Sequence, residues 1–262
     1  MLLRISGCFL LLGWLLPSGE VFGQAVEHED VEKIESRGRP IAPDRDVDLR
    51  QVVKEIVRKT NEFRREQERK PVTENGKLME TARYFADYMA RTDTYGHTAD
   101  GKRPAQRAKE HGYEYCIVLE NIAYEYNSEG FTTDTLAKGF FEGWKHSPGH
   151  RRNMLDADVS ETGVAVARSA RTGYYYTVQM FGRPRSQAIE FQIANRSDVA
   201  VDYRIAGQSF SLPPGIIRTH QRCRSAEVTM RLPGGETRTV RPEGGDRFAV
   251  VKEGEGLKLR NE

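Results

Sequence analysis

Cysteine is scarce in this chain, and neither sign of charge is in excess. The 262 residues contain three cysteines, and 40 lysines and arginines stand against 38 acidic residues. So few thiols exclude a fold held together mainly by disulfides. Cys116 and Cys223 lie beyond the first 25 residues, and a bridge between them or two free buried thiols fits the sequence equally well. The balanced charge gives no footprint for a polyanionic partner, so we expect no nucleic-acid binding.

Long apolar runs are also lacking. The longest, residues 9–16, is far shorter than the roughly 20 residues that span a bilayer, and the small-x-small pattern at 23–25 follows it. This combination predicts an export signal at 1–25, cleaved before Val26, and a mature protein without a transmembrane segment. A lipid-modified Cys8 is disfavoured because it precedes the apolar run. We expect a secreted or periplasmic protein.

Apolar residues recur at helical spacing in several stretches between residues 49 and 146. Residues 26–46 are charged and poor in large apolar side chains, which predicts a flexible leader. Asp48 then precedes a helical pattern as a suitable N-cap. Helices are predicted at about 49–63, 78–91, 104–111 and 133–146.

The period changes after the last of these helices. Residues 164–168 and 174–181 alternate or are rich in β-formers and enclose a turn, which predicts a hairpin. The stretch 113–126 fits neither helix nor strand clearly. Helices around a hairpin sheet predict a three-layer α-β-α domain over 47–184. Beyond it, short alternating segments between turn residues predict a small all-β sandwich over 186–262, so the fold class is α+β.

Four segments carry the most unusual residue pattern in the chain. They are residues 95–98 (YGHT), 119–123 (LENIA), 143–155 (GWKHSPGHRRNML) and 163–167 (GVAVA). Their order and spacing resemble the bacterial secreted branch of the CAP superfamily, the SCP/PR1-like group named after cysteine-rich secretory proteins, antigen 5 and pathogenesis-related 1. The third segment is the most specific because it is long and unusual in composition. The family's α-β-α sandwich agrees with the architecture that the periodicity predicts.

The resemblance implies a central cleft in which histidines and acidic groups converge. The matching residues are His97, Glu120 and His150. Two neutral imidazoles and a carboxylate can hold a divalent metal such as zinc and leave one position open to water. The same three residues are the candidates for acid–base catalysis. A single histidine in a polar loop is usually a surface group, and Glu120 could instead be a buried acceptor for backbone amides.

The chain departs from the family pattern at two positions. Leu119 replaces a glycine often found before the Glu-Asn-Ile segment, which affects backbone freedom more than chemistry. The other departure affects the site. Many eukaryotic members carry a second cleft glutamate three residues after the tryptophan, where this chain has Ser147. The site therefore lacks one carboxylate unless Glu142 or His146 enters the cleft. We expect Ser147 to cap a short helix that begins at Pro148.

Membership of this fold leaves the activity open. The first hypothesis is a non-enzymatic extracellular binding module, with an extracellular protein, a lipid or a cell-envelope ligand as its partner. The alternatives are a metal-dependent hydrolase, such as a peptidase, and a lipid- or sterol-binding protein. The missing glutamate favours binding over hydrolysis, and the sequence leaves open whether the protein is an enzyme.

Overall fold

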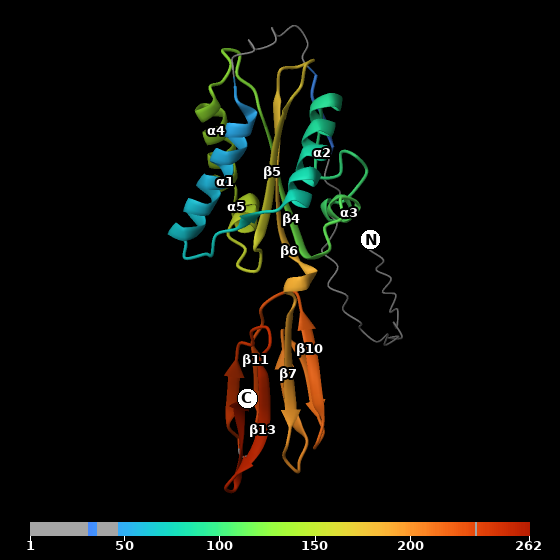
Figure 1. The fold of residues 1–262 in the computed structure, drawn as a ribbon, viewed down its shortest axis with the longest axis vertical. Coiled ribbons are helices and arrows are strands. Elements are labelled where there is room, and N and C mark those ends of the chain that lie inside the picture. The colour runs from blue at the N-terminus through green and yellow to red at the C-terminus, as the bar shows by residue number, and fades with distance from the viewer. Residues whose placement is uncertain (1–30, 36–46, 234) are drawn as a thin grey trace, which may run out of the picture.

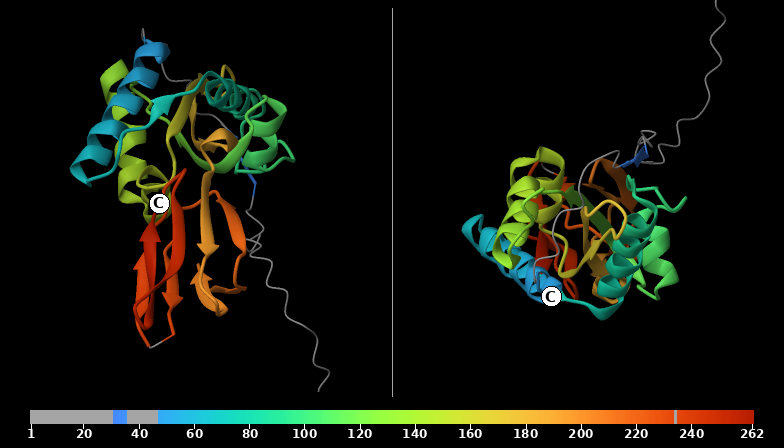
Figure 2. Two further views of the ribbon diagram at one scale, coloured as in Figure 1. Left: turned by 60° about the horizontal axis from the view of Figure 1, so that its bottom comes forward. Right: turned by 90° about the horizontal axis from the view of Figure 1, so that it is seen from above.

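The structure is a computed structural model that describes residues 31–35, 47–233 and 235–262 (Figure 1). The predicted export signal at 1–25 and most of the predicted leader lie outside these residues. Helices and a sheet form one end of the molecule, and strands form the other (Figure 2). No helix in the described part of the chain is long and apolar enough to cross a membrane.

The helices predicted from apolar spacing are all present, and a short fifth one follows them. They are α1 (Leu49–Glu66), α2 (Gly76–Thr92), α3 (Pro104–Glu110), α4 (Thr133–His146) and α5 (Pro148–Met154). Asp48 caps α1 by accepting hydrogen bonds from two backbone amides, and Asn75 caps α2 in the same way. Ser147 occupies the N-cap position of α5, which begins at Pro148 as predicted, but its side chain accepts no capping hydrogen bond. Its backbone amide donates to the carbonyl of Trp144 at the end of α4.

A four-stranded sheet lies between the helices. Its strands, in spatial order, are β2 (Thr73–Glu74), β5 (Glu161–Arg168), β6 (Tyr175–Pro184) and β4 (Tyr115–Glu125). The strands β5 and β6 form the predicted antiparallel hairpin, β4 runs antiparallel to β6, and β2 runs parallel to β5. The stretch 113–126, which the sequence leaves unclassified, therefore supplies the strand on the far side of the hairpin.

Hydrophobic clusters cover both faces of this sheet. The helices α1, α4 and α5 pack on one face, in a cluster that includes Trp144. The helices α2 and α3 pack on the other face, in a cluster that includes Phe85 (Figure 1). Gly163 lies where α2 crosses β5, and a Cβ atom there would come within 2.3 Å of the Leu78 backbone. Glycine thus permits the close approach of helix and strand. The predicted three-layer α-β-α arrangement and the α+β class are confirmed.

Strands alone make up the C-terminal part, which follows the short 3-10 helix η1 (Arg185–Gln187). They are β7 (Ile189–Asn195), β8 (Val201–Ile205), β9 (Gln208–Leu212), β10 (Ile217–Arg222), β11 (Val228–Arg231), β12 (Thr237–Val240), β13 (Arg247–Glu253) and β14 (Gly256–Asn261). They form two sheets, ordered β10-β7-β13-β14 and β12-β11-β8-β9. Side chains of both sheets, such as Phe191 and Tyr203, share one buried cluster, as the predicted all-β sandwich requires.

Two residues of the predicted leader form a strand that pairs with the α-β-α part. Residues Glu32–Lys33 form strand β1, which pairs antiparallel with β3 (Thr94–Tyr95) just before His97. The backbone amide of Ile34 also donates to the carbonyl of Asp93 at 2.8 Å. The charged composition of this stretch did not indicate a strand.

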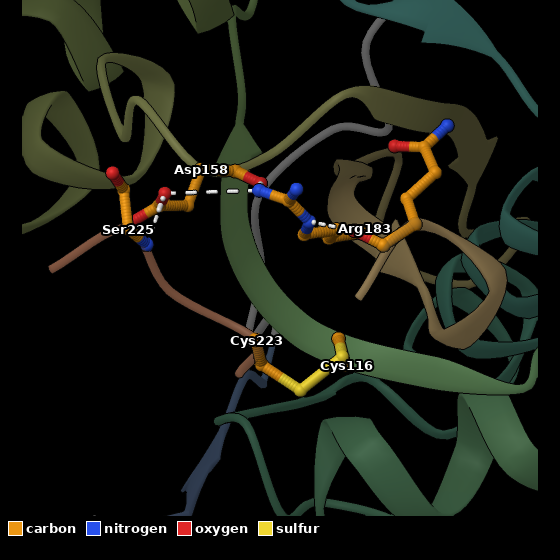
Figure 3. Close-up of a disulfide and its surroundings, with 6 residues drawn as sticks. Cys116, Asp158, Arg183, Cys223 and Ser225 are labelled. Carbon is orange, nitrogen blue, oxygen red and sulfur yellow. Dashed lines mark hydrogen bonds and ion pairs between the residues drawn. A yellow bond between two sulfur atoms is a disulfide. The ribbon is translucent and has the colours of Figure 1, made fainter. Parts of the chain in front are cut away.

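A disulfide ties the two parts of the molecule together (Figure 3). Cys116 lies near the start of β4, and Cys223 directly follows β10. Of the two states compatible with the sequence, the structure has the bridge. The backbone amide of Ser225 donates to Asp158 at 3.0 Å, and Arg224 forms an ion pair with Asp156 at 2.8 Å. The loop between β10 and β11 is therefore held against the α-β-α part.

Candidate functional site

The three predicted site residues line one pocket. His97 lies in the turn after β3, Glu120 in the middle of β4, and His150 in the first turn of α5. The pocket has a volume of about 480 Å³, and its wall also includes Asp156 and Arg224. The fold thus brings together residues from three separate segments, as the resemblance implied.

Glu120 is a buried carboxylate held by an arginine. Both of its oxygens accept hydrogen bonds from Nη2 of Arg107, at 2.7 and 2.9 Å. Nη1 of the same guanidinium donates to Asp100 at 2.8 Å. The side chains of all three residues are at most 1% exposed. A buried carboxylate needs such a partner, because the loss of hydration would otherwise favour its neutral form.

The carboxylate of Glu120 also orients His97. Its Oε1 lies 2.7 Å from Nδ1 of His97. An ionised carboxylate can only accept a hydrogen bond, so Nδ1 carries the proton and Nε2 of the neutral ring bears the lone pair. This carboxylate–imidazole pairing is the arrangement that fixes the tautomer of metal-binding histidines.

Two asparagines hold His150 against the sheet. Asn121 of β4 donates to the backbone carbonyl of His150 at 3.2 Å. Asn153 of α5 donates to Oδ1 of Asn121 at 2.9 Å and to the carbonyl of Glu120 at 3.2 Å. The short helix α5 is thereby fastened to β4 beside Glu120. The structural hydrogen bonds of these asparagines explain their place in the motif.

The surroundings of His150 favour a neutral ring. Burial lowers the pKa of His150, and the positive charge of a protonated His97 nearby lowers it further. His150 is therefore uncharged at pH 7, which is the form that binds metals. His97 and His150 line the same pocket.

The residues present fit a metal site with two imidazole ligands. Within residues 31–35, 47–233 and 235–262, no three His, Cys, Asp or Glu side chains are grouped to hold an ion. Both oxygens of Glu120 are already engaged, by Arg107 and by His97. Glu142 and His146 do not line the pocket; His146 is exposed and contacts the carbonyl of Glu142. The position of the missing glutamate is not filled by either residue.

The sequence gives no signal that two arginines, Arg107 and Arg224, contribute to the site. Arg107 belongs to a short helix outside the four motif segments, and nothing in the sequence marks it as buried. Arg224 lies in the C-terminal part and reaches the pocket because of the neighbouring disulfide. Both depend on contacts between segments far apart in the chain. The motif segments of the sequence identify only His97, Glu120 and His150 as site residues.

The comparison with known families agrees with this architecture. Residues 57–181 match the family described as CAP, the cysteine-rich secretory protein family. This segment of the chain is a CAP domain, as its four motif segments predicted. None of the curated protein sequences matches the chain.

Several solved structures are similar to about half of this chain. An outer surface protein from Borrelia burgdorferi is 18% identical, with a TM-score of 0.46; the match covers 53% of this chain and 96% of that one. An extracellular protein containing a SCP domain from Bacillus anthracis is 20% identical, with a TM-score of 0.44; the match covers 52% of this chain and 41% of that one. NaASP2 with Zn²⁺ is 16% identical, with a TM-score of 0.40 and coverages of 54% and 83%. The chain thus spans less than half of the Bacillus protein.

Proposed function

We propose that this protein is a secreted binding module whose CAP cleft holds a divalent ion, such as zinc, between His97 and His150. The observation that carries the proposal is the hydrogen bond between Nδ1 of His97 and Glu120, because it turns Nε2 into the metal-binding nitrogen. The half-buried His150, whose pKa is lowered, supplies a second, neutral imidazole. Imidazole ligands bind zinc and similar ions better than they bind magnesium or calcium.

Binding is favoured over hydrolysis by the state of the carboxylates. The two that line the pocket, Glu120 and Asp156, are each paired with an arginine. A general base must accept a proton from a water molecule within hydrogen-bond reach. The oxygens of Glu120 and Asp156 already accept hydrogen bonds from guanidinium groups, so neither carboxylate is placed to serve a metal-dependent peptidase in this way.

A polar wall also argues against a sterol or lipid chain in this cleft. Its lining contains the two histidines, both ion-paired carboxylates, Arg152 and Asn153. Burying an apolar chain there would strip water from these groups without replacing their hydrogen bonds. The partner recognised together with the ion is therefore a polar group of an extracellular molecule.

Calorimetric titration with zinc tests the metal site. At pH 7.5 we expect one weak site per molecule, because structural zinc sites usually have four protein ligands and this one has two. His97→Ala and His150→Ala should each abolish measurable binding. His146→Ala is the matched control, since this exposed histidine lies outside the pocket, and it should bind as the parent does. Equal zinc uptake by all four proteins would refute the proposal.

A Glu120 variant and the pH dependence of zinc binding test the same metal site in two further ways. Glu120→Gln should weaken zinc binding by about 10-fold to 100-fold, as expected for a carboxylate that orients a ligand. Acid should release the ion as the imidazoles protonate, and the lowered pKa of His150 places its share of this loss below pH 6.5, the ordinary histidine value. Zinc-dependent cleavage of casein, lost in both histidine variants, would instead support the hydrolase.

A further inference from the structure

The strand β5 has an outer edge that is only partly paired. The short strand β2 meets it at Glu161 and Thr162, where the backbone amide of Asn75 donates to the Thr162 carbonyl at 2.9 Å. Beyond Thr162, β5 pairs with β6 on its inner side. Among the residues that the structure describes, no strand pairs with the rest of the outer edge.

The direction of the backbone groups on this edge follows from the strand repeat. The Thr162 carbonyl points outward to β2, and alternate residues of a strand point to the same edge. The polar backbone groups of Val164 and Val166 therefore also point outward. As expected for the residue between them, the Ala165 carbonyl points inward, where it accepts a hydrogen bond from Thr177 of β6. The edge thus presents a short row of backbone donors and acceptors.

A groove of about 530 Å³ runs along this edge between α1 and α2. In Figure 1, β5 is visible between the two helices, which cover opposite faces of the sheet. Leu49 and Val53 of α1 and Met79 of α2 give the groove apolar walls, and β5 provides its floor. An extended chain placed there would have the unpaired backbone in front of it and apolar surface on both sides.

The α1 wall of the groove is basic. Arg50 and Lys54 lie one turn apart, both are exposed, and Arg83 faces them from α2. None of these three cations has an ion-pair partner in the described part of the chain. On α1 no acidic residue lines the groove; Glu74 and Asp87 lie on the β2 and α2 side. Side chains that point toward α1 should accordingly be acidic.

We propose that the groove binds an extended peptide segment with alternating aliphatic and acidic residues, which adds a strand to the outer edge of β5. Main-chain hydrogen bonds to Val164 and Val166 would provide the pairing, and the side chains would alternate between the α1 and α2 walls. Arg50 and Lys54 would select acidic residues on one face. This inference does not depend on the metal proposed for the cleft.

A second copy of this chain fits the groove less well than an acidic peptide. Two β5 edges could pair antiparallel only about a two-fold axis, which places the α1 helices of both copies on the same face of the joined sheet. Arg50 and Lys54 of the two copies would then approach each other, and like charges at an interface oppose association. The charge of the α1 wall therefore favours a partner of opposite sign.

Fluorescence anisotropy with a labelled seven-residue peptide of alternating valine and glutamate tests the pairing. In such a peptide all glutamates present their amides to one edge and all valines to the other. N-methylation of one set should weaken binding at least 10-fold, and N-methylation of the other set should leave it unchanged. Equal effects of both sets, or no effect of either, would overturn the proposal, because addition to β5 uses a single edge of the peptide.

Charge-reversed proteins locate the binding surface with the same peptide. Arg50→Glu with Lys54→Glu should reduce affinity at least 10-fold. The matched control, Arg65→Glu with Lys138→Glu, changes the net charge equally at exposed residues that do not line the groove, and it should bind the peptide as the parent does. Equal losses in the two double variants would show diffuse charge attraction and would rule out this groove as the site.

Discussion

At the scale of single residues, the cleft depends on a buried guanidinium. Arg107 joins Asp100 to Glu120, and its guanidinium carbon also lies 3.5 Å from the ring centroid of Phe85. Because Glu120 in turn holds Nδ1 of His97, the arginine sets the position of the first imidazole without lining the pocket itself. Arg107 is thus a positioning residue for the proposed metal site.

We expect Arg107→Met to lower the free energy of unfolding by about 3–5 kcal/mol, because it leaves two buried carboxylates without their cation. Urea denaturation of the full chain measures this change. Lys102→Met is the matched control: its partner Glu110 is exposed, and such surface pairs contribute about 0–1 kcal/mol. Similar losses in the two variants would contradict the buried network described here.

The residues of the site differ in how far sequence could identify them. His97, Glu120 and His150 lie in motif segments, and the fold brings them to one pocket. The engagement of Glu120 by Arg107 could not be foreseen, because an arginine in a short charged helix is ordinarily solvated. Only the tertiary fold removes this side chain from water, and that burial depends on Phe85 and β4.

At the scale of elements, the contact between α2 and β5 restricts what position 163 can hold. A Cβ atom at Gly163 would lie 2.3 Å from both the Leu78 carbonyl carbon and the Met79 amide nitrogen. Backbone atoms cannot move aside as the end of a flexible side chain can. The crossing of α2 over the sheet therefore requires glycine here, next to the strand edge that forms the floor of the groove.

Gly163→Ala should lower the free energy of unfolding by about 1–3 kcal/mol, the usual cost of forcing an extra group into a packed site. Gly143→Ala is the contrasting variant, because nothing lies within 4 Å of a Cβ at this position of α4. It should raise stability by about 0.5–1 kcal/mol, since alanine suits a helix interior better than glycine. Thermal unfolding followed by circular dichroism separates the two. Equal and small shifts would mean that α2 does not lie so close to β5.

The sequence predicts helices and strands well where the local signals agree. It predicts them less well for strands whose two faces are both covered by helices. The bounds of α4 match the predicted 133–146, because Thr132 caps the helix and Ser147 with Pro148 ends it. The sequence does not identify the strand β4, because its residues do not alternate between buried and exposed, as is common in strands covered by helices on both faces. Sequence likewise could not show that Glu32–Lys33 pairs with β3, since the partners lie far apart.

At the scale of the whole molecule, the C-terminal sandwich contributes to the cleft. Cys223 is bonded to Cys116, and the next residue, Arg224, lines the pocket together with His150. The sequence left the bridge open, because pairing depends on where the loop after β10 lies relative to β4. Nothing in the local pattern of either cysteine specifies that position.

The bridge encloses a separation of 107 residues that includes the join at η1. We expect the chain to divide near residues 184–187, where helical periodicity gives way to alternating strands. A protease that cuts there should leave the two parts covalently linked, so that denaturing gel electrophoresis shows one band without reductant and two bands with it. The variant with Cys116→Ser and Cys223→Ser should show two bands under both conditions.

Loss of the bridge should also destabilise the uncut protein. Joining residues so far apart restricts the unfolded chain, and removal of such a link typically costs about 2–4 kcal/mol. Denaturation in urea of the parent and the double serine variant measures this difference. The remaining contacts, from Arg224 to Asp156 and from Ser225 to Asp158, are partly exposed and cannot replace a covalent link. Parent and variant with equal stability, or a parent that separates without reductant, would show that the two parts are not joined through Cys116 and Cys223.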